Sequence, residues 1–405
     1  MAVGSGVIPE LKPVAGIRVG TTSAGVKTPG RPDLVLMELD ESATVAGVFT
    51  LNQFCAAPVR ICKANLQSGK PRYLVINTGN ANAGTGKEGH EDALVCCQVV
   101  ADHAGVKLEE VLPFSTGVIG EKLPVERITA AVPAAFDALS DNGWLDAASG
   151  IMTTDTRPKA YSTQFEYQGQ IVTFSGISKG AGMIRPNMAT MLAYVATDAA
   201  VDAELLQRML KRSADKTFNR VTIDGDTSTN DSCMLIATGA SKLQITEADE
   251  ALFVAFNDAL DDIMLQLAQA IVRDGEGATK FITVAVEQAE TSAEALLAAY
   301  AVSHSPLVKT ALFASDPNWG RILAAVGYAG IDNLDVDALQ IYLGDICIVE
   351  EGGRASNYTE EAGQAAMNEE EITIRIVLNR GDVAETVWTT DLSKDYVSIN
   401  ADYRS

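Results

Sequence analysis

The sequence predicts an α+β protein, in which strands and helices occur in runs and do not alternate regularly. Apolar and polar residues alternate with period two at residues 33–40 and 44–50, which predicts strands. Apolar residues recur at helical spacing at 91–104, 203–214 and 251–272, which predicts amphipathic helices. Because the chain has 405 residues and 47% of them are hydrophobic, we expect two or three structural units.

The first half of the chain is expected to contribute most of the strands. We expect 33–40 and 44–50 to form an antiparallel pair, and 72–76 to form a strand that ends in a loop at 77–84. Gly105 is expected to end the helix at 91–104. The other expected elements are, in order, an edge strand at 16–20, a short turn at 113–118, a helix at 128–139, a loop at 152–156, a hairpin of 164–167 and 170–174, and a buried strand at 191–196.

The second half begins with the helix at 203–214, a polar loop at 224–231 and the long helix at 251–272. A smaller unit is expected to start at Phe281. The expected elements of that unit are helices at 293–301 and 306–313 and strands at 339–349, 372–378 and 385–389. The sequence therefore predicts two domains, 1–280 and 281–405.

Charge and composition exclude several classes of function. The formal net charge of −22, without clusters of lysine and arginine, argues against nucleic-acid binding. No apolar run approaches the roughly 20 residues that span a bilayer, so no membrane segment is expected. Six cysteines lack a Cys-x-x-Cys pair, and only three histidines are present, so no metal site is expected. Reduced thiols in the cytoplasm are the simplest interpretation.

Two loops invite ligand-binding interpretations that their spacing does not support. Gly84, Gly86 and Lys87 lie close together, but Ala81 replaces the first glycine of the phosphate-binding pattern and Glu88 replaces its hydroxyl. The loop at 224–231 lacks the glycine and the final glutamate of a calcium-binding loop. We interpret the first loop as a turn that enters a helix, and the second as a structural turn.

Thr190 lies where a glycine-rich loop and a proline turn meet the strand at 191–196. A β-branched residue often opens a strand, so position alone favours a structural role. The alternative is a nucleophile, but threonine needs a base, and no histidine is near it in sequence. If the bond between Ala189 and Thr190 were cleaved, the new α-amino group, with an ordinary pKa of about 7.7–8.0, could act as that base.

Six motifs, spread over most of the chain, carry a family resemblance. They are Asn77-Thr78-Gly79-Asn80-Ala81-Asn82-Ala83, Ser115-Thr116-Gly117-Val118-Ile119-Gly120, Met152-Thr153-Thr154-Asp155-Thr156, the run from Lys179 to Leu192, Asp224-Gly225-Asp226-Thr227-Ser228-Thr229-Asn230-Asp231 and Asp316-Pro317-Asn318-Trp319-Gly320-Arg321. In this order they resemble the self-cleaving ornithine acetyltransferases, the bifunctional enzymes of arginine biosynthesis. The resemblance implies a layered α/β sandwich, related to that of self-cleaving aminopeptidases, with a smaller C-terminal α+β domain whose tail returns to the active site.

The resemblance also implies roles for individual residues. Cleavage between Ala189 and Thr190 would make Thr190 the amino-terminal nucleophile of a chain 190–405. Thr116 and Gly117 match the pair that forms the oxyanion hole. The residues that match substrate-binding positions, in addition to Thr190, are Thr153, Lys179, Glu276, Asn400 and Ser405.

The implied reaction is acetyl transfer from N-acetylornithine to glutamate through an acetyl ester on Thr190, without a cofactor. The implied assembly is a heterotetramer of two α and two β chains in the cytoplasm. Three alternatives remain open from the sequence. The enzyme could also accept acetyl-CoA as donor, it could be a self-cleaving aminopeptidase of the same fold, or it could bind amino acids without catalysis.

Overall fold

The computed structural model describes residues 2–185 and 191–402, which form two compact units. The larger unit comprises Val7–Asn219 and Asp226–Ile271, within the described ranges. The smaller unit comprises Arg220–Gly225 and the described parts of 1–6 and 272–405. Among the described residues, no helix is both long enough and apolar enough to cross a membrane. The expected domain division after residue 280 stays a prediction.

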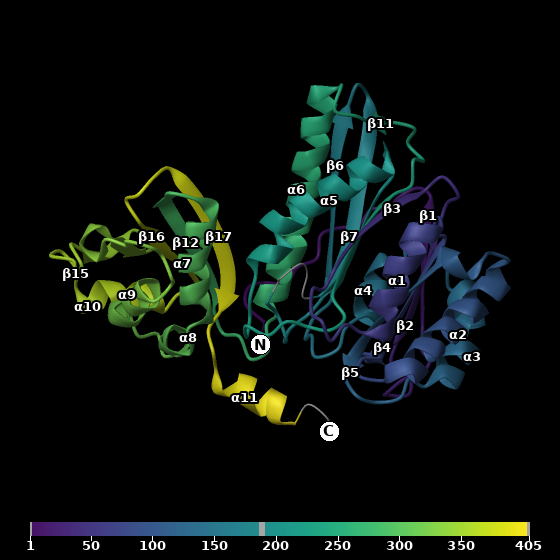
Figure 1. Ribbon diagram of the computed structural model, residues 1–405, viewed down its shortest axis with the longest axis horizontal. Coiled ribbons are helices and arrows are strands. Elements are labelled where there is room, and N and C mark those ends of the chain that lie inside the picture. The colour runs from purple at the N-terminus through teal and green to yellow at the C-terminus, as the bar shows by residue number, and fades with distance from the viewer. Residues whose placement is uncertain (1, 186–190, 403–405) are drawn as a thin grey trace. The chain divides into compact units, whose positions relative to one another are not determined.

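Two sheets form the centre of the larger unit (Figure 1). The first has the strand order β1 (Ile17–Thr22), β2 (Leu34–Leu39), β4 (Tyr73–Asn80), β5 (Val111–Val118). The second has the order β3 (Thr44–Phe49), β10 (Ser232–Ala237), β8 (Leu192–Thr197), β7 (Gln170–Lys179), β6 (Lys159–Tyr167). A further short pair joins β9 (Ala200–Val201) to β11 (Gln244–Ile245). The helical segments are α1 (Ala57–Ser68), α2 (Gly86–Ala104), η1 (Leu108–Glu110), α3 (Val125–Asp137), α4 (Trp144–Gly150), α5 (Ala203–Lys216), η2 (Phe218–Arg220) and α6 (Glu250–Arg273).

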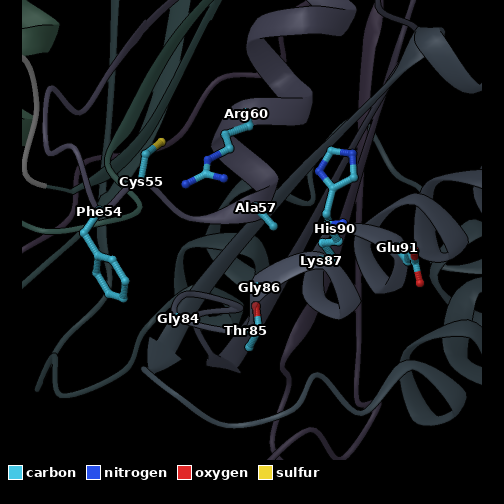
Figure 2. A pocket seen from close by; sticks show the side chains of 10 residues that line it. All are labelled: Phe54, Cys55, Ala57, Arg60, Gly84, Thr85, Gly86, Lys87, His90 and Glu91. Carbon is cyan, nitrogen blue, oxygen red and sulfur yellow. The ribbon is translucent and has the colours of Figure 1, made fainter.

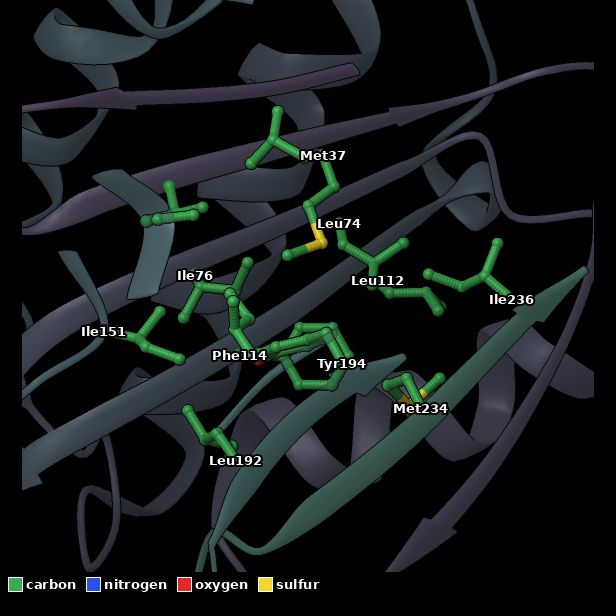
Figure 3. Close-up of a cluster of buried hydrophobic side chains, with 14 of the residues drawn as sticks. Met37, Leu74, Ile76, Leu112, Phe114, Ile151, Leu192, Tyr194, Met234 and Ile236 are labelled. Carbon is green, nitrogen blue, oxygen red and sulfur yellow. The ribbon is translucent and has the colours of Figure 1, made fainter. Parts of the chain in front are cut away.

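The two sheets pack against each other through a shared apolar core (Figure 3). Phe114 of the first sheet meets Tyr194 of the second edge to face, with ring centroids 5.2 Å apart. Because side chains alternate along a strand, Val35 and Met37 of β2 face this core. Leu34 and Leu36 lie on the opposite face of β2 and pack with buried residues of α2 and α3.

The outer face of the second sheet is covered by α5 and α6 (Figure 1). Phe174 of β7 packs on Phe256 of α6, with ring centroids 5.0 Å apart. The larger unit thus has four layers, helix, sheet, sheet and helix. The expected α+β class and the layered α/β sandwich are confirmed.

The smaller unit has one six-stranded sheet that buries an apolar core against helices. Its strand order is β15 (Gly353–Arg354), β14 (Ile346–Glu350), β13 (Gln340–Leu343), β16 (Glu371–Val377), β12 (Phe281–Ala289), β17 (Val383–Thr390). Its helical segments are α7 (Ser292–His304), α8 (Pro306–Phe313), α9 (Trp319–Gly327), η3 (Val336–Ala338), α10 (Glu360–Met367) and α11 (Lys394–Ala401). The expected helix at 306–313 is confirmed, and Ser305 Oγ accepts the Val308 N–H at its start.

The expected antiparallel pairing of 33–40 with 44–50 is wrong. Both segments are strands, but β2 pairs with β1 and β4, whereas β3 pairs with β10 in the other sheet. The short connection between them carries the chain from one sheet to the other. Alternation of apolar residues specifies which faces of a strand are buried, but it does not specify the strand's partner.

The expected turn at 113–118 is also wrong, since these residues belong to β5 and pair in parallel with β4. The strand expected at 72–76 is β4, which continues to Asn80 because it pairs with β5 along this whole length. Polar residues such as Asn77 and Ser115 are compatible with buried strands here because their side chains bond each other, with Ser115 Oγ donating to Asn77 Oδ1 at 2.6 Å. The expected hairpin and the buried strand after Met191 are confirmed as β6, β7 and β8.

Candidate active site

The polar residues of the larger unit gather where several strands begin or end. Lys179 is the last residue of β7, and Thr116 lies near the carboxyl end of β5. Lys179 Nζ donates to Thr116 Oγ1 at 3.3 Å, and the Thr116 residue is only 7% exposed. The fold therefore joins two residues that the family resemblance assigned to one site.

Gly117 is required at a place where β4 and β5 approach each other closely. Its φ is +133°, a conformation that side-chain-bearing residues rarely adopt. A Cβ added at Gly117 would lie 2.2 Å from the carbonyl carbon of Gly79 and 2.5 Å from Asn80 N. Glycine is thus needed next to Thr116, where the parallel pairing of β4 and β5 becomes irregular at Asn80.

Asp155 connects Thr153 to the loop that follows Lys179. One carboxylate oxygen accepts the Gly180 N–H at 2.7 Å and Lys159 Nζ at 2.6 Å. The other accepts the Thr153 N–H at 2.9 Å. Burial alone would raise the pKa of Asp155, but Lys159 and Lys179, with these hydrogen bonds, hold it well below its usual value. Asp155 is therefore a buried anion that stabilises the backbone on both sides of the site.

A small pocket opens beside Thr116 and Lys179. Its lining residues are Thr116, Lys179, Gly180, Gly182, Met183, Ile184, Met191, Leu192, Ser228, Asn230 and Asp231. Asn230 Nδ2 donates to Ala81 O at 2.6 Å and to Ser115 O at 2.9 Å. The motif at 224–231, interpreted from sequence as a structural turn, thus contributes to the wall of this pocket and ties the ends of β4 and β5 to it.

Asp231 is a pocket residue that sequence reasoning did not single out. Its residue is 2% exposed, and its Oδ2 atom has no hydrogen-bond partner among the described residues. Burial raises the pKa of Asp231 well above its ordinary value, although Ser228 and Lys179 oppose this shift. The neighbouring Ser232 N–H donates to Met191 O at 2.9 Å, so Asp231 lies close to the residue that follows Thr190 in the sequence.

In the smaller unit, Glu276 and Asn400 contact each other directly. Asn400 Nδ2 donates to Glu276 Oε2 at 2.7 Å and to Tyr396 O at 3.0 Å. Glu276 lies in a loop and is 8% exposed, whereas Asn400 belongs to α11. Gly277 allows α11 to approach this loop, because a Cβ there would lie 2.5 Å from Tyr396 N.

A buried lysine near this loop was also missed. Lys309 Nζ donates to Thr389 Oγ1 at 3.0 Å and to the Thr390 carbonyl. Burial lowers the pKa of Lys309 to about 8, although Asp391 and Asp224 favour its charged form. Lys309 lies in an apolar helical stretch, and nothing in that stretch of sequence indicated that the lysine would be buried among polar groups.

The site residues predicted from the sequence thus fall into two described groups. Thr116, Gly117, Thr153 and Lys179 lie in the larger unit, where Lys179 contacts Thr116 and Asp155 links Thr153 to Gly180. Glu276 and Asn400 lie in the smaller unit. Ala189, Thr190 and Ser405 lie outside the described residues.

A layered α/β sandwich with a hydroxyl and a lysine cation beside one pocket has the donors that an oxyanion of acyl transfer requires, so the site is that of a candidate acyl-transfer enzyme. The chain belongs to the ArgJ family, whose model matches residues 18–405. The resemblance seen in the six sequence motifs is thereby confirmed.

Two curated relatives extend this match over the whole chain. The arginine biosynthesis bifunctional protein ArgJ of Pseudomonas syringae pv. tomato is 60% identical over 406 residues, covering 100% of both proteins. The protein of the same name from Pseudomonas fluorescens is 58% identical, again over 100% of both.

Solved structures of related proteins are also similar. The arginine biosynthesis bifunctional protein of Bacillus halodurans is 38% identical with a TM-score of 0.49, covering 51% of this chain and 97% of that one. The ornithine acetyltransferase of Mycobacterium tuberculosis, solved with ornithine, is 35% identical with a TM-score of 0.39, covering 44% of this chain and 94% of that one.

Proposed function

We propose that this protein moves the acetyl group of N-acetylornithine to glutamate, releasing ornithine and N-acetylglutamate. As a member of the ArgJ family, it is an acetyltransferase of arginine biosynthesis. The residues that perform the reaction are our proposal.

In the first stage the chain cleaves itself. Thr190 Oγ attacks the carbonyl carbon of Ala189, and the peptide nitrogen becomes the free α-amine of Thr190 as an ester forms. Water then opens this ester and leaves a carboxylate on Ala189. The fragments are residues 1–189 and 190–405. The new amine serves as the base that Thr190 needs for the second stage.

In the second stage Thr190 Oγ attacks the acetyl carbonyl of N-acetylornithine, and the amine of ornithine leaves with a proton. The acetyl group then passes from Thr190 to the amine of glutamate, which makes the mechanism ping-pong. Thr116 and Gly117 stabilise the oxyanion in both steps. Thr153, Lys179, Glu276, Asn400 and Ser405 bind the substrates.

The hydrogen bond between Lys179 and Thr116 is the observation that supports this proposal most directly. A threonine hydroxyl has one hydrogen, so a hydroxyl that accepts from Lys179 keeps its O–H for another acceptor. That acceptor can be an oxyanion in the pocket, which Met191, the neighbour of Thr190 in sequence, also lines. The lysine cation also favours negative charge nearby and disfavours protonation of a nearby amine.

Intact-protein mass spectrometry tests the nucleophile and the donor together. Wild type and Thr190→Ala are measured before and after brief exposure to N-acetylornithine, with Thr129→Ala as a control threonine on α3. Wild type and the control should appear as two fragments, and the fragment 190–405 should gain one acetyl group. Thr190→Ala should remain one chain without added mass. An uncleaved wild type that gains no acetyl group would disprove the proposal.

A second donor is favoured by the names of the curated relatives, which are bifunctional proteins. We propose acetyl-CoA as this donor, to be tested by measuring N-acetylglutamate formation from acetyl-CoA alone. Family membership favours acetyl transfer over the self-cleaving aminopeptidase and over amino-acid binding without catalysis. A heterotetramer of two α and two β chains and a cytoplasmic location remain proposals that depend on the family resemblance.

A further inference from the structure

A second pocket in the larger unit lies between two segments that come before and after β4 in the chain (Figure 2). One segment includes the start of α1, and the other is the loop that leads into α2. The lining residues are Phe54, Cys55, Ala57, Arg60, Gly84, Thr85, Gly86, Lys87, His90 and Glu91. None of them has a role in the reaction proposed above.

The pocket combines two permanent cations and an imidazole. Arg60 comes from α1, and Lys87 and His90 come from the first turns of α2. Among the described residues, none of these three side chains makes a hydrogen bond or an ion pair. Glu91 is the one carboxylate in the lining, and Figure 2 shows it beyond His90, on the side away from Arg60.

The pocket concentrates positive charge in an acidic chain, which has 53 acidic residues against 31 lysines and arginines. Unpaired cations around a concave surface form a site that is complementary to an anion. The guanidinium of Arg60 supplies a planar fork that suits phosphate oxygens, and Lys87 adds a point charge.

An exposed aromatic ring borders the same pocket. Phe54 is 56% exposed although it is large and apolar. Gly84, with a φ of +72°, lies against it, since a Cβ there would be 3.2 Å from the ring. An exposed ring beside cations suits a ligand with both a flat base and phosphate groups, because such a base can stack on the ring.

The loop between β4 and α2, part of which lines this pocket, is hydrogen-bonded to the end of β5, the strand that carries Thr116. Ala83 O accepts the Gly120 N–H at 2.9 Å, and the Ala81 N–H donates to Val118 O at 2.9 Å. Ala81 O in turn accepts from Asn230, which lines the pocket of Thr116 and Lys179. The two pockets are therefore connected through a few hydrogen-bonded residues at the ends of β4 and β5.

We propose that the pocket of Arg60, Lys87 and Phe54 binds the phosphate groups and the base of a coenzyme A thioester. This inference depends on the second donor proposed above. The acyl arm of the bound thioester would extend along the ends of β4 and β5 toward Thr116. Thr190 Oγ would then attack the thioester carbonyl, the carbon–sulfur bond would break, and the thiol would leave with the proton of the Thr190 hydroxyl. The acetyl-Thr190 ester is the same intermediate as in transfer from N-acetylornithine.

The sequence of this loop does not match the motif that binds nucleotide triphosphates, as expected if the pocket binds a different kind of phosphate ligand. A triphosphate loop cradles its phosphates with consecutive backbone amides and a hydroxyl that binds magnesium. Here one of the positive charges comes from Arg60 on α1, which lies outside the loop, so a sequence motif of the loop alone cannot contain it.

The test uses the double variant Arg60→Ala/Lys87→Ala. The control is Lys70→Ala/Lys216→Ala, which removes the same charge from exposed residues outside the pocket. The KM for acetyl-CoA should rise by roughly 10- to 100-fold in the pocket variant, as expected when charge-assisted hydrogen bonds are lost. The KM for N-acetylornithine should stay unchanged, and the control should match wild type in both reactions.

Two probes and one variant identify the part of the ligand that binds. Acetyl-pantetheine, which lacks the nucleotide, should be an equally poor donor for wild type and for the pocket variant. Inorganic pyrophosphate should compete with acetyl-CoA but not with N-acetylornithine. Phe54→Ala should weaken calorimetric binding of coenzyme A without changing binding of pyrophosphate.

The outcomes separate this inference from the proposed function. A pocket variant that loses both reactions equally, or that keeps its KM for acetyl-CoA, would overturn the pocket assignment. Absence of coenzyme A binding to wild type would overturn it as well. Loss of the N-acetylornithine reaction in wild type would instead contradict the proposed transfer to glutamate.

Discussion

Lys179 Nζ lies 3.3 Å from Thr116 Oγ1, although 63 residues of chain separate them. The end of β7 delivers the lysine and β5 delivers the threonine, so the contact joins the two sheets of the larger unit. Because the lysine has no acceptor capacity, the threonine oxygen must accept in this bond. The pair can therefore present both a cation and an O–H to one developing negative charge.

Replacing Thr116 tests this arrangement. Thr116→Val keeps the shape of the side chain but removes its hydroxyl, and we expect kcat to fall by about 10²- to 10³-fold, as for loss of one oxyanion donor. KM for N-acetylornithine should change little, because the lost interaction strengthens in the transition state. Steady-state kinetics of cleaved enzyme provide the measurement.

Thr116→Ser is the matched control, since it retains the hydroxyl and should keep kcat within several-fold of wild type. A valine variant with normal kcat would show that Thr116 has only a structural role. A serine variant as inactive as the valine variant would point instead to the methyl group and to packing.

Asp155→Asn should destabilise the larger unit strongly. The substitution leaves Lys159 buried without its anion, and breaking a buried ion pair in this way costs about 3–5 kcal/mol. Because the folded-state pKa is lowered, this stabilisation is complete above about pH 5 and declines as the pH falls below the unfolded-state value of about 3.9. Urea unfolding at pH 7 and pH 3 should therefore show a larger difference from wild type at pH 7.

Glu247→Gln serves as the comparison, because its ion pair with Arg208 is exposed. Such pairs contribute about 0–1 kcal/mol, so this variant should unfold like wild type. Equal effects of the two substitutions would mean that Asp155 is not the buried anion described above.

Asp231→Asn should have the opposite pH dependence. Burial raises the pKa of Asp231, so the folded chain keeps a proton that the unfolded chain releases above about pH 4. The free energy of unfolding of wild type therefore carries a term that decreases as the pH rises toward the folded-state pKa. Asparagine is neutral in both states, so the variant should gain stability relative to wild type between pH 5 and pH 8.

Urea unfolding at pH 5 and at pH 8 measures this gain in the free energy of unfolding, provided that the preparations are in the same state of cleavage. Asp141→Asn provides an exposed control and should follow the pH profile of wild type. A variant of Asp231 that loses the same stability at both pH values would contradict the assignment of a neutral side chain.

Asn400→Ala tests the contact with Glu276 in the smaller unit. Removing the 2.7 Å hydrogen bond frees the Glu276 carboxylate to adopt other orientations, at a cost of about 1.5–3 kcal/mol for a bond to a charged group. If Glu276 binds a substrate amine, we expect KM for glutamate to rise by roughly tenfold or more. Ser398→Ala, on the same helix, should leave KM unchanged.

Local sequence patterns predicted individual elements well, because they depend on neighbours along the chain. The two-residue connection Gln168-Gly169 predicted the hairpin of β6 and β7, and helical periodicity predicted α5 and α6 within a few residues of their bounds. The family motifs also contained Thr116 and Lys179. Apart from this hairpin, none of these patterns indicated which strands would pair.

Partner choice depends on contacts across long sequence separations. β3 pairs with β10, which lies almost two hundred residues later, and nothing in the alternation of either strand excludes the nearer β2. The polar network was hidden for a similar reason. Asp155 and Asp231 resemble ordinary loop aspartates in sequence. Burial raises the pKa of both, but the lysines and hydrogen bonds around Asp155 reverse the direction of its shift.

The amino-acid sequence by itself determined the α+β class, the helices and strands with strong periodicity, and the membership of the six motifs in one family. Those properties follow from side-chain chemistry and spacing within short segments. Only the packing of distant segments decided how the chain crosses between two sheets and how Lys179 comes to contact Thr116. It also placed Arg60 and Lys87 beside one pocket, where neither side chain has a partner among the described residues. Burial drives this packing, because it selects strand partners by complementary apolar faces and requires an enclosed charge to have a partner, whereas the exposed Arg60 and Lys87 stay available to a ligand.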